Sequence, residues 1–561
     1  MVASALLASS AEAQWQLDGI LLSAAGGDQY APTIVPDGAG GAIIAWADDH
    51  STPQRIYAQH LNAAGVPQWA ANGIPLCTTG GNQFSPAAVG DGGGGAIVAW
   101  ADSRAGNFDI YAQHIDASGT PLWGSGGLAI CLAANDQIVP VIISDLKANL
   151  PAPGAIIAWQ DSRSGVPNIY AQSVDGQLGA VRWAANGVAV APTAASQTDP
   201  VMCTDGMGVT LSNPKGAIIA WTDSRNAGVT GQDIYAQRMS AGGVPQWGAS
   251  GLPVCTAAGA QQLPSIVFLF SGNVIVAWAD SRSGSSDIYA QHVGGGTVQW
   301  AAGGIPLCGA AGDQISVNLA TDVSGGAIAA WEDGRNATDH DIYAQRVDGT
   351  GAVLWSLDGA SVCAASGRQM LPAVATDQVQ GALVAWVDQR AVDRDVYGQR
   401  IDSSGVSQGN PDGVRLGRRT IEYRPQIISD NAQGAIVAWT HSDGFYDKVY
   451  ANRIFANGGA VGVPTGPVAA FRLFTPFPNP ARAATTVAFE LPSAQRLTAE
   501  VFDLDGRLVR TLARGREFPS GREALRWDGR TEADQAVPDG MYFLEVHAEA
   551  GSAVRRILVI H

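Results

Sequence analysis

The sequence predicts an all-β protein, an eight-bladed β-propeller followed by a small Ig-like β-sandwich. One tryptophan motif recurs eight times at spacings of 53 to 62 residues, which is the size of a four-stranded propeller blade. A lone outer strand precedes the first repeat, and the last repeat ends without one. The motif tryptophans are Trp46, Trp100, Trp159, Trp221, Trp278, Trp331, Trp386 and Trp439.

Each repeat supplies four short strands. An apolar run such as GGAIIAW (40–46) ends at the motif tryptophan, and a second strand, usually Ile-Tyr-Ala-Gln, follows it. A third begins after Trp-x-x-x-Gly, as at Trp15 and Trp69, and a fourth lies around a proline 17 residues later, as at Pro32 and Pro86. Runs that are apolar on both faces are typical of strands packed between neighbouring blades.

The two ends of the repeat array favour a closed ring over an open β-solenoid. Residues 15–23 form an outer strand with no blade before it, while the eighth repeat ends near Ile454 and lacks that strand. We expect the N-terminal strand to complete the last blade, which hides two sheet edges that would otherwise pair with other chains.

Composition limits the function classes. The formal net charge is -17, and residues 467–561 hold 12 arginines against 12 acidic residues, so the acidic excess belongs to the propeller. This charge excludes a nucleic-acid partner, because phosphate binding needs a basic surface. No stretch reaches the roughly 18 apolar residues of a transmembrane helix. We expect a monomer without a transmembrane segment.

The N-terminus predicts export. Val2 to Ala8 is a short apolar run, and Ala11-Glu12-Ala13 fits a signal-peptidase site, so residues 1–13 are interpreted as a signal peptide or its remnant. The run lacks a preceding basic residue, which leaves open both a start codon further upstream and an alanine-rich tail. The expected location is secreted or on the outer cell surface. The expected domains are the propeller (14–455), a linker (456–470) and the C-terminal domain (471–561).

Two repeated polar sets form the candidate ligand site. Asp-x-Arg follows the motif tryptophan in six repeats, and a glutamine precedes the innermost strand in seven. Both should lie at one end of the propeller, where guanidinium and amide groups match sugar hydroxyls or carboxylates. The candidate binding residues are Asp102, Arg104, Asp161, Arg163, Asp223, Arg225, Asp280, Arg282, Gln83, Gln137 and Gln261.

A structural role for the same residues is the favoured alternative. A motif found in nearly every blade is usually what builds blades, so Asp and Arg are expected to clamp hairpin turns or pair across blades. Function is then expected where the repeat breaks. The breaks are residues 146–153, 207–215 and 226–233, and the irregular eighth repeat with Glu422, Tyr423, Arg424, His441 and Asp443.

Cysteines and histidines give no sign of a cofactor or a metal, and none is expected. Five cysteines occupy equivalent repeat positions, at Cys77, Cys131, Cys255, Cys308 and Cys363, which predicts buried thiols rather than disulfides. His60, His114 and His292 share one repeat position, expected at the surface. No catalytic residue is assigned, because no distinct carboxylate pair stands out for glycoside hydrolysis.

The repeat resembles propeller repeats of exported bacterial proteins and, more distantly, those of sialidases. This similarity spans about residues 14–455. The sialidase arginine triad and its Tyr/Glu nucleophile pair cannot be placed on unique positions of this chain. A hydrolase or lyase acting on carbohydrate is therefore only the alternative to a non-catalytic propeller that binds a polysaccharide or another protein.

The C-terminal segment has a different pattern. Strand-like runs at 485–491, 497–502, 508–512, 524–527, 541–548 and 554–560 alternate with turn signals such as Asp539-Gly540, which predicts a β-sandwich. The motifs FPNPARAATTVAFELP, VFDLDGRLVRTL, LRWDGR, VPDGMYFLEV and RRILV resemble the C-terminal sorting domain of type IX secretion cargo and the related FlgD-like Ig-like domain.

This resemblance covers residues 471–561. It implies recognition by an export machine of the outer membrane, followed by release or attachment at the cell surface. Arg555 and Arg556 match the family's basic ending, although Arg stands where Lys is common. A stalk domain is the alternative, because one fold hosts many roles.

Overall fold

The computed structural model describes residues 15–16, 18–145, 154–206, 215–270, 272–390, 393–417, 421–442, 444–459, 471–473, 476, 481, 484–491, 493–504, 506–519, 521–549 and 551–560. The predicted signal peptide, Asp443 and the breaks at 146–153 and 207–214 lie outside them. The chain divides into two compact units, residues 1–461 and 462–561, a division that falls inside the predicted linker.

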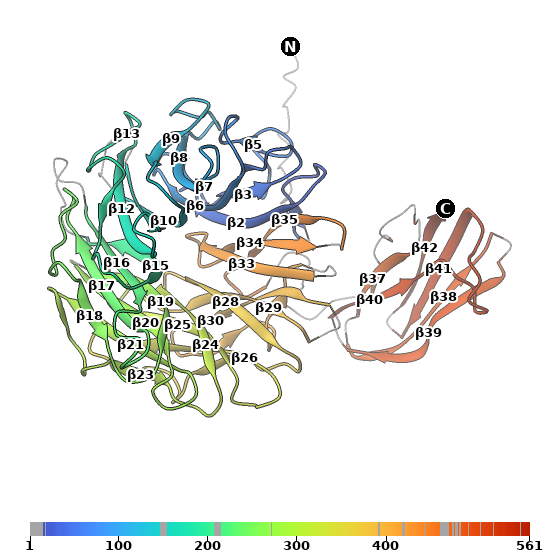
Figure 1. Cartoon of the computed structure of the whole chain (residues 1–561). Coiled ribbons are helices and arrows are strands. Elements are labelled where there is room, and N and C mark those ends of the chain that lie inside the picture. The colour runs from blue at the N-terminus through green and yellow to red at the C-terminus, as the bar shows by residue number, and fades with distance from the viewer. Residues whose placement is uncertain are drawn as a thin grey trace, which may run out of the picture. The chain divides into compact units, whose positions relative to one another are not determined.

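Eight antiparallel sheets form the first unit, as the repeat predicted. Figure 1 shows them around a common centre, with the last blade (β33 to β35, orange) beside β2 of the first. Each blade begins with its innermost strand. The innermost strands are β2 (Gln29–Pro36), β6 (Gln83–Gly90), β10 (Gln137–Ser144), β15 (Gln197–Thr204), β19 (Gln261–Phe270), β24 (Gln314–Thr321), β28 (Gln369–Thr376) and β33 (Ile421–Ser429).

The second strand of each blade carries the motif tryptophan, which is 0% exposed in all eight blades. Its residues are buried because neighbouring blades cover both faces of the sheet, and this burial is the main core of the propeller. These strands are β3 (Ala42–Asp48), β7 (Ala96–Asp102), β11 (Ala155–Asp161), β16 (Ala217–Asp223), β20 (Asn273–Asp280), β25 (Ala327–Asp333), β29 (Ala382–Asp388) and β34 (Ala435–Ser442).

The third strand pairs with the second along its full length, with tyrosine opposite tryptophan, as in Trp100 opposite Tyr111. The third strands are β4 (Arg55–Leu61), β8 (Asp109–Ile115), β12 (Asn168–Asp175), β17 (Asp233–Met239), β21 (Asp287–Gly294), β26 (Asp341–Val347), β30 (Asp395–Ile401) and β35 (Asp447–Ile454).

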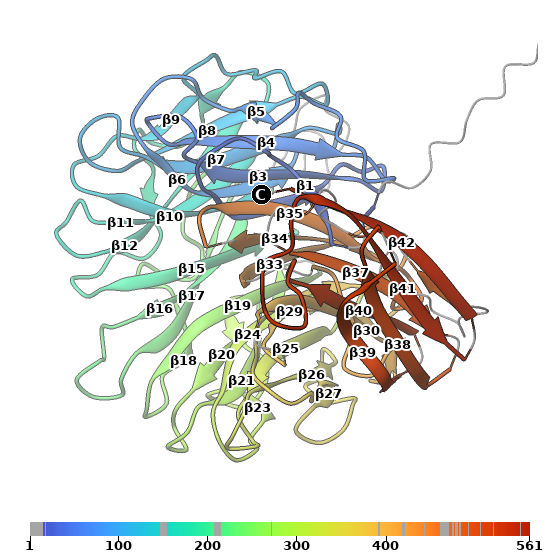
Figure 2. The same cartoon turned by 90° about the vertical axis from the view of Figure 1, so that its right-hand side faces the viewer.

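Short outer strands finish the blades: β5 (Ile74–Pro75), β9 (Leu128–Cys131), β13 (Ala180–Val181), β14 (Val188–Ala189), β18 (Leu252–Cys255), β22 (Thr297–Val298), β23 (Ile305–Cys308), β27 (Ala360–Cys363), β31 (Ser407–Gln408) and β32 (Val414–Arg415). The eighth blade takes its outer strand from the N-terminus, because β1 (Ile20–Leu21) pairs with β35 (Figure 2). This confirms the predicted closure. The innermost strands also contact one another in sequence, and β33 contacts β2.

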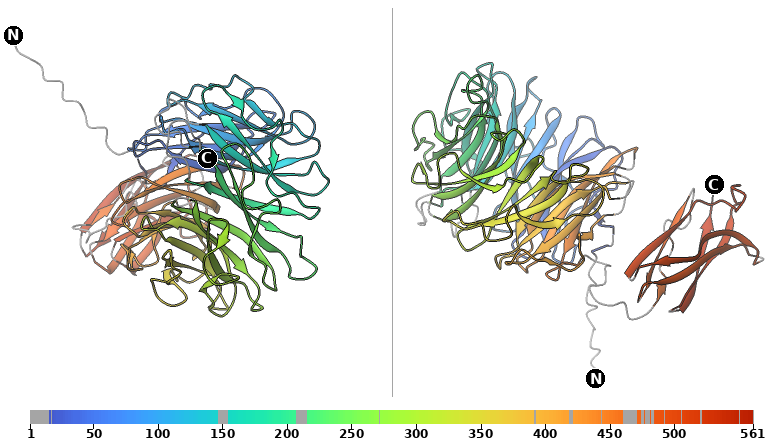
Figure 3. Two further views of the ribbon diagram at one scale, coloured as in Figure 1. Left: turned by 90° about the vertical axis from the view of Figure 1, so that its left-hand side faces the viewer. Right: turned by 90° about the horizontal axis from the view of Figure 1, so that it is seen from below.

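The second unit is an Ig-like β-sandwich of two sheets, which face each other in Figure 3 (right). One sheet has the order β36-β37-β40 and the other β39-β38-β41-β42. Trp527, Phe489 and Leu544 are among the side chains that fill its core. The strands are β36 (Arg472–Leu473), β37 (Thr485–Leu491), β38 (Gln495–Phe502), β39 (Leu508–Phe518), β40 (Gly521–Trp527), β41 (Gly540–Ala548) and β42 (Gly551–Val559). All but β36 were predicted.

Candidate functional site

Every innermost strand carries a β-bulge at the same place. The register with the second strand shifts there, as between Tyr30 and Thr33 in β2. One residue of each bulge has a left-handed backbone, with φ between 51° and 59°. These residues are Ala31, Ser85, Val139, Asp199, Leu263, Ser316, Leu371 and Arg424. Such a backbone costs roughly 1–2 kcal/mol in an L-residue, and strain of this kind clusters at functional sites.

Six different side chains occupy this position in the eight blades, although the backbone repeats. A proline follows it in seven blades, and Val317 follows it in the sixth. If the bulge served packing alone, one side chain would suit all eight blades, because each blade meets its neighbour in the same way. The backbone of the bulge is therefore constant, whereas the side chain that it carries is variable.

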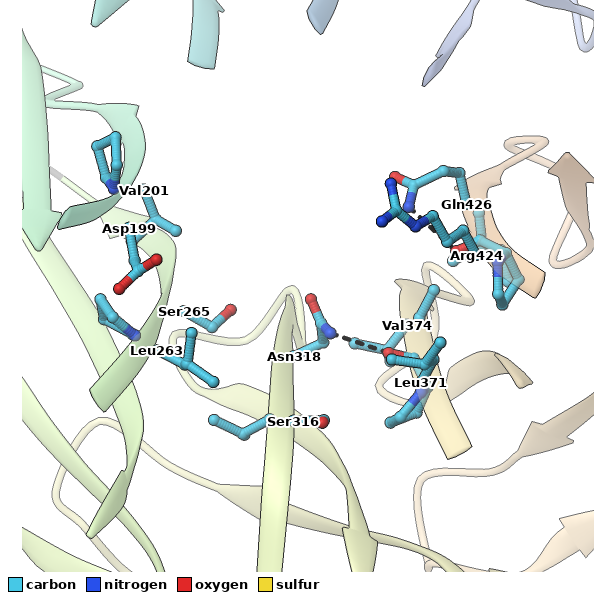
Figure 4. Close-up of a pocket in the computed structure, with 17 residues that line it drawn as sticks. Asp199, Val201, Leu263, Ser265, Ser316, Asn318, Leu371, Val374, Arg424 and Gln426 are labelled. Atoms are coloured by element: carbon cyan, nitrogen blue, oxygen red, sulfur yellow. Dashed lines mark hydrogen bonds between the residues drawn. The ribbon is translucent and has the colours of Figure 1, made fainter. Parts of the chain in front are cut away.

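Five of these bulges line a central hollow of about 500 Å³, which is shown in Figure 4. Its wall comes from β15, β19, β24, β28 and β33, the innermost strands of the fourth to eighth blades. The volume lies in the range of about 300–1,000 Å³ that is usual for ligand pockets. The lining residues are Asp199, Pro200, Val201, Leu263, Pro264, Ser265, Ser316, Val317, Asn318, Leu371, Pro372, Ala373, Val374, Arg424, Pro425, Gln426 and Ile427.

The hollow carries charge at two places. Asp199 and Arg424 lie on opposite sides of the opening in Figure 4. The guanidinium of Arg424 is exposed and makes no hydrogen bond or ion pair with the described residues. Asp199 is half-buried, and its carboxylate accepts one hydrogen bond, from the Thr198 hydroxyl at 2.8 Å. Both side chains therefore keep bonding capacity for a ligand.

Between these two charged side chains, the wall of the hollow carries both polar and apolar side chains. Asn318 and Gln426 present amides, Ser265 and Ser316 hydroxyls, and Leu263 and Leu371 exposed apolar side chains.

Hydrogen bonds between blades hold this wall. The Asn318 amide donates to the Pro372 carbonyl at 2.9 Å, and the Ser265 hydroxyl accepts from the Leu319 amide at 3.1 Å. The Leu371 amide donates to the buried Glu332 carboxylate at 2.8 Å. The hollow is thus largely pre-formed, which lowers the entropic cost of binding.

The predicted binding residues lie elsewhere, as clamps inside the blades. Asp102, Asp161, Asp223, Asp280, Gln83, Gln137 and Gln261 are all 0% exposed. Each glutamine lies opposite the aspartate of its own blade, as Gln83 does opposite Asp102. The two sets therefore share one end of the propeller, as predicted.

The second blade shows how such a clamp is built. Asp102 accepts from the Trp100 indole at 3.1 Å, from the Gln83 amide at 3.1 Å and from Arg104 at 2.5 Å. The Arg104 guanidinium stacks 3.7 Å over the Tyr111 ring and donates to the Gly126 carbonyl at 2.9 Å. Burial disfavours the charged carboxylate, but the bonds from Arg104 and Trp100 outweigh it and lower the pKa of Asp102.

The same clamp recurs with Arg163, Arg225 and Arg282, which stack on Tyr170, Tyr235 and Tyr289. This arrangement is the structural role that the repeat favoured. Ligand binding by these residues stays a prediction, and it can involve only the guanidinium edges, because the four arginine side chains are just 17–23% exposed.

The five cysteines at equivalent repeat positions are buried free thiols, as predicted. The thiol of Cys131, on β9 of the second blade, lies 3.1 Å from the guanidinium of Arg163 in the third blade, so it joins one blade to the clamp of the next. Burial raises the pKa of Cys131 to about 12. The thiol is therefore protonated at neutral pH and a poor nucleophile.

The histidines correct the expectation of a surface position. His114 is 1% exposed, and its imidazole contacts Asp91 at 3.0 Å and the Gly176 carbonyl of the next blade at 2.9 Å. His292 makes the equivalent contact with the Gly349 carbonyl at 3.1 Å. The position joins blades, because the third strand faces the neighbouring hairpin there.

The eighth blade breaks the clamp. Glu422 replaces the glutamine and His441 replaces the aspartate, and the two lie opposite each other in the sheet. Without the aspartate, the buried Trp439 indole nitrogen has no hydrogen-bond partner among the described residues. The eighth blade was one of the predicted breaks in the repeat. Of the described residues named there, Arg424, two residues beyond Glu422, lines the hollow.

In the other described break of the repeat, the polar side chains form hydrogen bonds with one another. In the turn at 226–233, the Asn226 amide and the Thr230 hydroxyl both donate to Asp233, at 2.8 and 3.1 Å. Among the described residues there is no cluster of three metal-ligating side chains, and no helix there is long and apolar enough to cross a membrane.

Sequence reasoning missed the hollow except for Arg424. A sequence signal for these positions exists. The variable residue lies directly before the repeated proline, or before Val317 in the sixth blade.

The fold defines an all-β protein, a propeller joined to an Ig-like domain. Residues 480–552 match the model of the FlgD Ig-like domain family. Over 58 residues the chain is 40% identical to the basal-body rod modification protein FlgD of Salmonella typhimurium, which covers 10% of this chain and 25% of that protein. The Salmonella typhi protein matches equally. The chain thus spans about a quarter of the length of the curated relatives it matches.

Solved structures resemble the propeller only distantly. An ulvan lyase is 11% identical at a TM-score of 0.42, over 79% of this chain and 96% of that one. The Dos1 propeller is 11% identical at 0.40, over 77% and 93%. An α-L-arabinofuranosidase of Fusarium graminearum is 11% identical at 0.33, over 66% and 93%. Likenesses at this level carry no argument about what this chain binds.

Proposed function

We propose that this chain is an exported or cell-surface binding protein, a monomer whose propeller holds a polysaccharide segment in the central hollow. The observation that carries the proposal is the ring of left-handed bulges, which presents Asp199, Arg424 and the polar side chains between them toward one cavity. Amide, hydroxyl and carboxylate groups in one concave wall match the hydroxyls of a sugar. A folded protein partner would need a contact of about 800 Å² per side, which favours an extended chain for this hollow.

Hydrolysis or elimination is the alternative function. Glycoside hydrolysis uses two carboxylates placed about the scissile bond, and Asp199 is the only carboxylate among the described lining residues. No lysine, histidine or tyrosine stands among those residues as a general base. The composition of the wall therefore favours binding over turnover.

A glycan array with the full chain tests this proposal. We expect retention of a subset of glycans without product, and loss of retention in Leu371→Trp, which places a bulky ring in the hollow. Leu357→Trp, at an exposed position outside the lining (83% exposed), is the matched control. Turnover of any retained glycan, or retention that survives Leu371→Trp, would overturn the proposal.

The C-terminal module is proposed to direct export across the outer membrane. Its match to the FlgD Ig-like domain supports the fold, and the basic pair Arg555 and Arg556 on β42 supports the sorting role. Deletion of residues 472–561 should leave the protein in the periplasm of a host with the matching export machine. Unchanged display at the cell surface, measured by protease accessibility of intact cells, would exclude the role.

A further inference from the structure

We infer that the hollow selects a saccharide of low charge density, with one carboxylate bound at Arg424 and a neutral sugar at Asp199. The inference rests on the proposed function and names the ligand class of the same site. It follows from the exposed guanidinium of Arg424 and from the carboxylate of Asp199 on the opposite wall.

Arg424 differs from the arginines that build the blades. The guanidinium groups of Arg104, Arg346 and Arg453, for example, are bound to aspartates at 2.5, 2.9 and 2.6 Å. Arg424 instead stands exposed on the wall of a cavity, without a hydrogen bond or ion pair to the described residues. A planar guanidinium in this state matches a carboxylate, which it binds through two parallel hydrogen bonds.

The bulge of β33 fixes where this arginine leaves the backbone. Its φ is 55°, and Pro425 follows it, so the chain holds a long charged side chain in a conformation that costs free energy. The chain has a net charge of -17, and Arg424 is the one cation among the described residues that line the hollow, where it provides local attraction for an anion.

Asp199 limits the charge of the ligand. Its carboxylate lies on the opposite side of the hollow and accepts, among the described residues, one hydrogen bond, from the Thr198 hydroxyl. A ligand carboxylate located at Asp199 would be repelled by this charge, whereas the hydroxyls of a neutral sugar there can donate to it. The two walls therefore orient the ligand, with the acidic sugar at β33 and the neutral sugar at β15.

Calorimetric titration of the full chain with three tetrasaccharides tests the inference: one with alternating uronic acid and neutral sugars (hyaluronan), one of uronic acid alone (oligogalacturonide) and one neutral (chitotetraose). The alternating tetrasaccharide should bind tightest. Arg424→Gln should weaken it by about tenfold or more, because a charge-assisted hydrogen bond is lost, and should weaken the neutral probe far less. Asp199→Asn should raise affinity for the fully acidic probe.

Arg394→Gln is the matched control, because Arg394 is exposed and lies outside the lining. Equal binding of the neutral and alternating probes, or no effect of Arg424→Gln, would overturn the inference. If binding to either probe were still abolished by Leu371→Trp, the proposed function would stand. Failure of all three probes and of the glycan array would overturn both.

Discussion

Gly19, at the N-terminal end of the propeller, lies against the indole of Trp439 in its last blade. A Cβ at Gly19 would stand 2.7 Å from the Trp439 ring, and the backbone there has φ of 79°. Every other blade has the same pair from its own outer segment, such as Gly73 on Trp46 and Gly413 on Trp386. The glycine–tryptophan contact that occurs within each of the other blades thus also closes the ring, between Gly19 and Trp439.

We therefore expect Gly19→Ala to destabilise the closure. The left-handed backbone costs an alanine roughly 1–2 kcal/mol, and overpacking against the indole adds about 1–3 kcal/mol. The free energy of unfolding should fall by that sum, and the N-terminal strand should become sensitive to limited proteolysis.

Gly38→Ala is the control for the backbone cost. Gly38 has the same φ of 79°, but no atom lies within 4 Å of its Cβ position. Equal losses of stability in the two variants would show that the Trp439 contact contributes nothing to closure.

A second prediction concerns the clamps. Asp223 accepts hydrogen bonds from the Trp221 indole at 2.8 Å and from the Arg225 guanidinium at 2.6 Å. Asp223→Asn should cost about 3–5 kcal/mol, because Arg225 loses its partner and the new amide faces donors. Chemical denaturation measures the loss, and Arg225→Gln in the same chain should restore part of it.

The pH dependence of this loss has a definite sign. Burial opposes the charge of Asp223, but the bonds from Arg225 and Trp221 outweigh it, so the pKa of Asp223 is lowered in the folded state. Its stabilisation is therefore present above pH 4 and is lost as the pH falls through the lowered pKa. Asp223→Asn should lack this acid limb, and an unchanged limb would contradict the assignment.

Much of this architecture could be predicted from the sequence. The eight tryptophans from Trp46 to Trp439 fixed the number of blades, because each repeat must bury the same face against its neighbour. The spare strand after Trp15 indicated how the ring closes. Buried thiols followed from the equivalent positions of Cys77 and the other four.

The site could not be predicted in the same way. The proline that follows the variable residue in seven blades indicated extended backbone, which concealed the left-handed bulge at Arg424 and its equivalents. The Asp-x-Arg residues were predicted to bind a ligand at the surface, but their arginines stack on tyrosines such as Tyr111 and so pack within the blade. His114 was expected at the surface, but it is covered by Gly176 of the next blade. This contact is remote in sequence and could not be predicted from the repeat.

A third prediction follows from Asp341 at the start of β26. Burial, and then the nearby charges of Asp333 and Asp339, raise the pKa of Asp341 to about 6. The unfolded chain therefore ionises first, so this group lowers stability as the pH rises from about 4 to 6. Asp341→Asn should raise the free energy of unfolding at pH 7 by at most about 3 kcal/mol.

The variant amide fits the site. Asn336 donates to one oxygen of Asp341, which the amide oxygen can replace, and the other oxygen has no hydrogen-bond partner among the described residues. The third blade already carries Asn168 at the equivalent position. Thermal unfolding from pH 4 to 8 measures the effect, and parallel curves for the two proteins would contradict the raised pKa.

The bulges themselves yield the last prediction. Val139 is β-branched, has φ of 53° and is 40% exposed, so its side chain contributes little packing to offset the left-handed backbone. Val139→Gly should remove roughly 1–2 kcal/mol of strain, against about 0.5–1 kcal/mol lost to the flexibility of glycine in the unfolded chain. The variant should unfold at an equal or higher temperature.

Val141→Gly, two residues later in the same strand but without a left-handed backbone, should be destabilising and is the control. Val139 lies outside the hollow, so ligand binding should be unchanged in Val139→Gly. A clear loss of stability in Val139→Gly, comparable with that of Val141→Gly, would mean that the bulge carries no strain at this residue. The ring would then be an ordinary feature of the strands and would lend no support to a central site.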